Sequence, residues 1–199
     1  MIHAASQRIA HYCVKQSWVK KEDVAWCSYA IEKKLLTALF FFWLTLCAFV
    51  CGKYIEVGAF TLVFFLLRRR IGGWHAERAW SCQILSVVLV LSAVFAVGPL
   101  LITHMPMVGL YLADIVVFVW ALILKPVYPP QVHFGTPEKQ ANNKKKNQLL
   151  VAVLLIQIIA GLLQKNIVIV YSGLGVLTGV TSVYIEQANQ WLKERNVVK

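Results

Sequence analysis

The chain has 199 residues, of which 59% are hydrophobic and only 15% are charged, and its formal net charge is +11. Soluble domains carry about 25% charged residues, so this composition excludes an ordinary soluble domain and predicts an integral membrane protein built as a single bundle. In such a protein a positive charge reflects orientation and anionic lipid headgroups, and it does not indicate a nucleic-acid partner.

The first 34 residues precede the long apolar runs and have the periodicity of amphipathic helices. In each of two stretches the apolar residues recur on one helical face, while Lys and Arg occupy the rest. This pattern predicts two interfacial helices on the inner leaflet, and Glu22 and Asp23 favour the start of the second. No removable signal peptide is expected. The apolar faces consist of Ala5, Ile9, Tyr12 and Cys13, and of Val24, Cys27, Ile31 and Leu35.

Six apolar segments follow, each near the roughly 20 residues needed to cross about 30 Å of hydrocarbon. The expected fold is therefore an all-α integral membrane protein with about six transmembrane helices. We expect one membrane-embedded domain, with interfacial helices over residues 1–34, a bundle over 35–187 and a cytoplasmic tail over 188–199. The six segments are residues 35–52, 54–69, 82–103, 107–125, 148–164 and 166–187.

Positive charges determine the expected orientation. If the N-terminus is inside, eighteen of the twenty Lys and Arg residues lie on the cytoplasmic side, and only Lys53 and Lys165 lie outside. The positive-inside rule therefore predicts that both termini are cytoplasmic.

The longest polar loop is expected between residues 126 and 147. It begins with Pro126, Pro129, Pro130 and Pro137, which argue against a regular helix, and ends in a lysine run. The lysines are either a topology determinant or a binding surface for an acidic peptide or lipid headgroups. The run consists of Lys144, Lys145 and Lys146 after Asn142 and Asn143.

The segment between the second and third apolar runs contains the candidate catalytic residues. A basic cluster, Arg68–Arg70, and the pair Gly72-Gly73 precede His75 and Cys82. A histidine beside a cysteine can generate a thiolate nucleophile. On a straight helix these two residues would be about 10 Å apart along the axis, so contact requires a break or a re-entrant bend between about Arg70 and Ala79, on the cytoplasmic side.

Such a break would put Cys82 near the start of a helix, where the helix dipole and nearby arginines, including Arg78, favour a thiolate. The alternative is a buried small cysteine and an interfacial histidine without mutual contact. Glu77 could orient the histidine, and Ser81 or Gln83 could donate to an oxyanion. Asp114, within the fourth apolar segment, is either functional or a structural partner. The other cysteines have no metal-like spacing and indicate no disulfide framework.

The order of these motifs resembles the AgrB family, the membrane peptidases of accessory-gene-regulator quorum sensing. The arginines, the glycine before the histidine, His75-Ala76, and the cysteine seven residues later carry the likeness. The basic tail, the six spans and Tyr128-Pro129-Pro130 before the lysine run extend it over nearly the whole chain.

This resemblance implies a cysteine endopeptidase of the bacterial cell membrane that processes a propeptide, AgrD. Cys82 would attack the carbonyl where the signal segment meets an acidic tail, and His75 would act as base and then as acid. The propeptide's own cysteine would then take over the acyl group and close a thiolactone ring.

The substrate would also contact basic and glycine residues, and membrane lipids would surround the protein. The family is described as dimeric, so a homodimer is expected, and no cofactor or metal is expected. Two other readings stay open, namely a small peptide transporter and a non-enzymatic scaffold for an acidic partner. The expected substrate-binding residues are Arg68, Arg69, Arg70, Gly73, Arg78, Lys144, Lys145 and Lys146.

Overall fold

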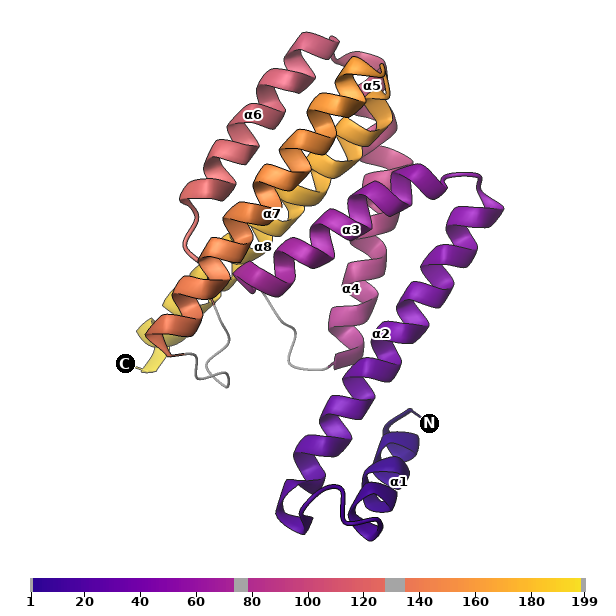
Figure 1. Ribbon diagram of the computed structural model, residues 1–199, viewed down its shortest axis with the longest axis vertical. Coiled ribbons are helices and arrows are strands. Elements are labelled where there is room, and N and C mark those ends of the chain that lie inside the picture. Colours follow the sequence, from indigo (N-terminus) through magenta and orange to yellow (C-terminus); the bar gives the residue numbers. More distant parts are fainter. Residues whose placement is uncertain (1, 74–78, 128–134, 198–199) are drawn as a thin grey trace. The chain divides into compact units, whose positions relative to one another are not determined.

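The computed structural model describes residues 2–73, 79–127 and 135–197, and the elements described there are helices joined by turns (Figure 1). The chain divides into two compact units, which are described separately. The first comprises Met1–Cys51 with Ala76–Val87, and the second comprises Gly52–His75 with Val88–Lys199.

Most of the first unit is a pair of helices. α1 (Ile2–Lys15) packs against α2 (Val24–Val50), and the hydroxyl oxygens of Ser6 and Ser28 lie 3.3 Å apart in this contact. A short 3-10 turn over Lys21–Asp23 leads into α2 at the acidic residues that were expected to mark a helix start. α1 therefore confirms the first predicted amphipathic helix.

The second predicted interfacial helix does not exist as a separate element. α2 continues without a break from Val24 through the expected first span to Val50. The 27 residues include neither glycine nor proline, so nothing in them ends a helix. The first such residue is Gly52, whose φ of +64° is the left-handed conformation that commonly follows a helix end.

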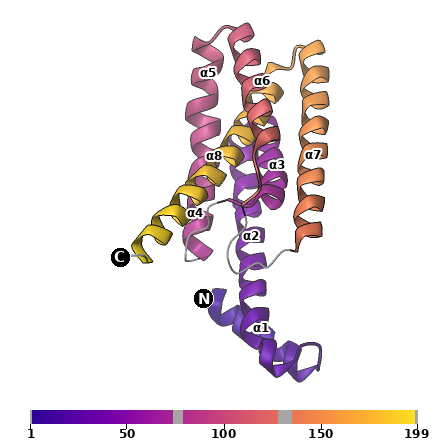
Figure 2. The same ribbon diagram turned by 90° about the vertical axis from the view of Figure 1, so that its left-hand side faces the viewer.

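The second unit is built around its C-terminal helix. α8 contacts α3, α5, α6 and α7 and so forms the centre of this unit (Figure 2). A π-helical turn over Ala93–Val97 joins α4 and α5 into one helical run. The helices are α3 (Tyr54–Ile71), α4 (Ala79–Ser92), α5 (Gly98–His104), α6 (Met107–Ile123), α7 (Thr136–Leu162) and α8 (Asn166–Val197), with the first turns of α4 assigned to the first unit.

Glycines allow α8 to approach its neighbours closely. The carbonyl oxygen of Phe60 in α3 is 2.8 Å from the position that a Cβ would take at Gly175. One turn farther along, Leu67 is 3.0 Å from the corresponding position at Gly179. A larger residue at Gly175 would force the two backbones apart, whereas one at Gly179 would displace the Leu67 side chain. As in other membrane bundles, small residues therefore determine the helix contact.

The expected loop between residues 126 and 147 is shorter than predicted. α7 begins at Thr136 and carries the whole lysine run in its first three turns. Pro137 lies in the first turn, where its missing N–H would have no helical partner, so it is compatible with a helix start. The backbone N–H of Gly135 donates to Glu138 Oε2 at 3.0 Å, which caps this end.

All six apolar segments are helical, but not all of these helices are long and apolar enough to cross a membrane. Four helices are long and apolar enough: residues 21–50, 84–104, 136–162 and 166–192. α6 is apolar but has only 17 residues, and α3 ends in three arginines. The protein is thus an all-α membrane protein with four clear candidate spans, and the full number of six stays a prediction. α8 also extends to Val197, through most of the expected tail.

In the second unit, both the core and much of the surface are formed by apolar side chains. On α6, Phe118 and Ala121 are buried, whereas Ile115, Val116 and Val119 are exposed. A helix that is apolar on all sides is stable when lipid covers its outer face. This distribution supports the membrane assignment independently of helix length.

The close approach of α3 and α8 leads to a first prediction. Gly175→Ala should lower the free energy of unfolding by about 1–3 kcal/mol, because the new methyl group would overlap the Phe60 carbonyl oxygen. Gly58→Ala is the matched control, since no atom lies within 4 Å of its Cβ position and alanine favours helix. Thermal unfolding in detergent would measure both, and equal stability of the two variants would contradict this account.

Candidate functional site

The predicted helix break before the cysteine is confirmed. α3 ends at Ile71, and the next helix, α4, begins at Ala79. Cys82 is therefore the fourth residue of the described part of α4. Its side chain, like His75 and Arg78 as a whole, lies outside the described residues, so the predicted contact between His75 and Cys82 stays a prediction.

Two glycines allow the chain to leave α3 where it does. Gly72 and Gly73 have φ values of +75° and +129°, a region that side-chain-bearing residues rarely adopt. The N–H of Gly72 still donates to the Arg68 carbonyl at 3.0 Å, which closes the last turn of α3. Together the glycines end α3 and redirect the chain within two residues.

Packing fixes the position of this glycine pair. The N–H of Val127, in the connector after α6, donates to the Ile71 carbonyl at 2.9 Å, and Val127 forms a parallel bridge with Gly72. A Cβ at Gly73 would lie 2.5 Å from Ser182 Oγ of α8. The start of the predicted catalytic segment is thus held between α8 and the connector.

The three arginines at the end of α3 have different surroundings. Arg68 lies over the Phe64 ring, with 5.6 Å between the guanidinium carbon and the ring centroid. Arg69 is exposed. Arg70 Nη1 donates to Asn142 Oδ1 of α7 at 3.4 Å. This contact brings the basic end of α3 next to the lysine-bearing part of α7.

The lysine run divides between two environments. Lys144 and Lys145 are exposed on α7. Lys146 is fully buried, and its ammonium donates to the backbone carbonyls of Leu122 and Leu124. Successive residues of a helix point about 100° apart, so three consecutive lysines cannot share one face. The structure thus buries Lys146 and directs its ammonium to the end of α6, and its expected contact with substrate stays a prediction.

A second polar cluster lies among the apolar helices α6, α7 and α8. Gln157 Nε2 donates to Ser172 Oγ at 2.8 Å and to Asp114 Oδ1 at 3.4 Å. Asp114 fits against Gly173, where a Cβ would overlap its carboxyl oxygen. The cluster thus links three helices through polar contacts, which supports the structural alternative for Asp114.

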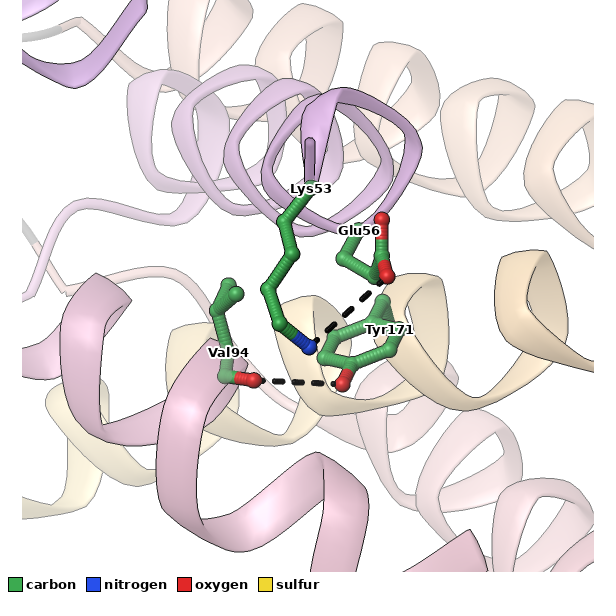
Figure 3. A network of polar contacts seen from close by, with 4 residues as sticks. All are labelled: Lys53, Glu56, Val94 and Tyr171. Atoms are coloured by element: carbon green, nitrogen blue, oxygen red, sulfur yellow. Dashed lines mark hydrogen bonds and ion pairs between the residues drawn. The ribbon is translucent and has the colours of Figure 1, made fainter. Parts of the chain in front are cut away.

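A further polar network lies at the opposite end of the second unit, where α3 and α8 begin (Figure 3). The Tyr171 hydroxyl donates to the Val94 carbonyl of the π-helical turn at 3.2 Å, and Lys53 lies 3.9 Å from Glu56. Among the described residues, no three His, Cys, Asp or Glu side chains are grouped so that they could hold a metal ion.

Sequence reasoning missed the residues that hold the glycine pair and the lysine run. Val127, Ser182 and Asn142 carry no motif, and their roles arise from contacts between distant parts of the chain. Only the burial of Lys146 had a signal, because it is the lysine in register with Leu150 and Val153 on the apolar face of α7.

These features define the class of protein: an all-α membrane protein in which a basic helix ends at a glycine pair and the next helix carries a cysteine near the start of its described part. The family model for accessory gene regulator B (AgrB) matches residues 6–185. The chain therefore belongs to the AgrB family and takes part in accessory gene regulator quorum-sensing processing. No curated protein and no solved structure matches the chain.

Gly73 provides a test of the packing at the site. Gly73→Ala should lower the free energy of unfolding by about 1–3 kcal/mol, because it combines a positive φ with a clash against Ser182 Oγ. Gly52→Ala, at a φ of +64° with nothing within 4 Å, is the control for a positive φ without a close contact. Thermal unfolding that is no worse for Gly73→Ala than for Gly52→Ala would exclude tight packing against α8.

Proposed function

We propose that the protein is a membrane cysteine endopeptidase that removes the C-terminal tail of an AgrD-like propeptide and promotes thiolactone cyclisation of the signal segment. The observation that supports this proposal is that α3 ends at the glycine pair and that Cys82 lies four residues into the described part of the next helix, α4. The family match supplies the class of substrate. The positive end of the helix dipole favours a thiolate at such a position.

The proposed chemistry uses two residues. His75 takes the proton of the Cys82 thiol, and the thiolate attacks the carbonyl carbon between the signal segment and the tail. The C–N bond breaks, and His75 returns its proton to the departing amine. The signal segment then remains on Cys82 as a thioester.

In the proposed cyclisation, the free energy of the thioester bond is kept. The thiolate of the propeptide's internal cysteine attacks the Cys82 thioester, a thiolactone forms, and the Cys82 thiolate is regenerated. Exchange of one thioester for another is close to isoenergetic, whereas attack by water would release the linear acid. Exclusion of water from the site would therefore favour the ring.

Basic residues are proposed to hold the acidic tail. The hydrogen bond from Arg70 to Asn142 joins the C-terminal end of α3 to the N-terminal part of α7. Arg68–Arg70 and Lys144 therefore belong to neighbouring helices. Of the expected set, Lys146 is left out. The proposed contacts are Arg68, Arg69, Arg70, Gly73, Arg78, Lys144 and Lys145.

The charges of the second unit support a cytoplasmic location for this site. α3 and α8 run in parallel, because Phe60 meets Gly175 and Leu67 meets Gly179. The arginines at the end of α3 therefore lie opposite the end that carries Lys53. By the positive-inside rule we propose that the arginine end and both termini are cytoplasmic. A homodimer surrounded by anionic lipid is the proposed assembly.

The first test is a direct assay of the dyad. Wild-type protein reconstituted in liposomes should release the acidic tail from its propeptide, and mass spectrometry should detect the released tail and the thiolactone. Cys82→Ala should reduce this by about 10³-fold or more, and His75→Ala by about 10²–10⁴-fold. Cys51→Ala, which removes an exposed cysteine, is the control and should remain active. Equal processing by the Cys82→Ala variant would favour the scaffold or transporter readings.

A second test concerns recognition of the tail. Lys144→Glu should raise KM by about three- to tenfold with little change in kcat, because a rim charge acts mainly on encounter and binding. A propeptide with one tail carboxylate changed to lysine should recover part of this loss. Lys165→Glu, in the turn between α7 and α8, is the matched control, and an equal effect there would exclude a specific contact at Lys144.

A further inference from the structure

Lys146 is a buried cation in an apolar part of the second unit. Its side chain is 0% exposed, and Leu124 and Leu150 are buried in the same region. Burial of an ammonium group is unfavourable by several kcal/mol unless hydrogen bonds and opposite charge compensate it. The chain carries a lysine here although exposed lysines one and two residues earlier would serve orientation equally well. Its position therefore requires another explanation.

The partners of Lys146 are the carbonyls that end α6. Its Nζ donates to Leu122 O at 3.0 Å and to Leu124 O at 2.8 Å, and Leu124 is the residue that ends this helix. The last carbonyls of a helix have no partner within it, and they carry the negative end of its dipole. The ammonium therefore caps α6 and fixes the point at which the chain leaves it.

The chain that leaves α6 reaches the end of α3 within a few residues. Three residues after Leu124, the Val127 N–H donates to Ile71 O at 2.9 Å, and Val127 forms a bridge with Gly72. Gly73 then packs against Ser182. A continuous series of contacts thus runs from Lys146 through connector 124–127 to the glycine pair, and His75 follows two residues later in the sequence.

We propose that Lys146 is a positioning residue of this enzyme. By capping α6 it holds connector 124–127 against the end of α3, and so determines the path on which the chain leaves Gly73 toward His75. This inference rests on the proposed peptidase function. It assigns Lys146 no contact with substrate, in contrast to Lys144 on the same helix.

A positioning role and a binding role affect different kinetic constants. Loss of the cap should misplace the base relative to the thiol, and a displacement of about 1 Å can reduce a rate by about 10²-fold. The kcat value should therefore fall, while KM stays within about twofold because the tail contacts are unchanged. The thiolate fraction of Cys82, which depends on its base, should fall with kcat.

The experiment compares one substitution at three adjacent positions. Lys144→Met, Lys145→Met and Lys146→Met keep a long unbranched side chain and each remove one charge. Each full-length variant is reconstituted in liposomes with the propeptide. Three quantities are measured: kcat and KM for tail release, the iodoacetamide alkylation rate of Cys82 by peptide mass spectrometry, and hydrogen exchange at the Val127 amide.

The inference predicts different results for the three lysines. Lys146→Met should lower kcat by about ten- to a hundredfold, slow alkylation of Cys82 and speed exchange at Val127. Lys144→Met should change only KM, and Lys145→Met should be close to wild type. Wild-type kcat and Cys82 reactivity in the Lys146→Met variant would overturn the inference, as would an equal loss of kcat in Lys145→Met.

A second variant tests the same contacts without removing the lysine. Val127→Pro deletes the N–H that donates to Ile71 and should reproduce the loss of kcat at unchanged KM. If both variants fail to give folded protein, Lys146 has a general structural role and the inference is wrong. If wild type does not release the tail, the proposed function fails, whereas faster exchange at Val127 in Lys146→Met would still establish the cap.

Discussion

The close approach of α3 and α8 at Gly175 is the constraint on which the rest of the second unit depends. Because no side chain separates Phe60 from Gly175, the two helices run side by side in parallel, and the end of α3 reaches Ser182 of α8. Gly73 can then turn away from α3 in contact with α8. The arginines of α3 lie beside the lysine-bearing turns of α7 through the hydrogen bond from Arg70 to Asn142. A bulkier residue at position 175 would therefore disturb the site as well as the bundle.

Polar groups within this unit replace the solvent that a membrane excludes. Hydrocarbon offers no hydrogen bonds, so exposed carbonyls and side chains need partners from the protein. Lys146 donates hydrogen bonds to carbonyls at the end of α6, and Gln157 connects three helices. The Tyr171 hydroxyl donates to the Val94 carbonyl of the π-helical turn. Each group acts where a soluble protein could use water, which explains why such residues occur in otherwise apolar helices.

Helix periodicity and charge revealed much of this organisation from the sequence. Each apolar segment is helical in the described residues, and α3 ends at the glycine pair, within the range predicted for a break between Arg70 and Ala79. Two boundaries were wrong, because proline fits the first turn of α7 and because nothing ends a helix between Val24 and Val50. The burial of Lys146 follows from its register with Leu150 and Val153 on α7, a pattern that the prediction did not use. The contact of Val127 with Ile71 depends on distant parts of the chain, so no local pattern reveals it.

The central claim is that Cys82 carries the signal segment as a thioester between cleavage and ring closure. The most direct test is the intact mass of the protein after brief reaction with a propeptide whose internal cysteine is replaced by serine, which slows release. The account predicts an added mass equal to the propeptide without its tail, located on the Cys82 peptide and removed by hydroxylamine. Release of the tail without any covalent adduct on Cys82 would contradict it.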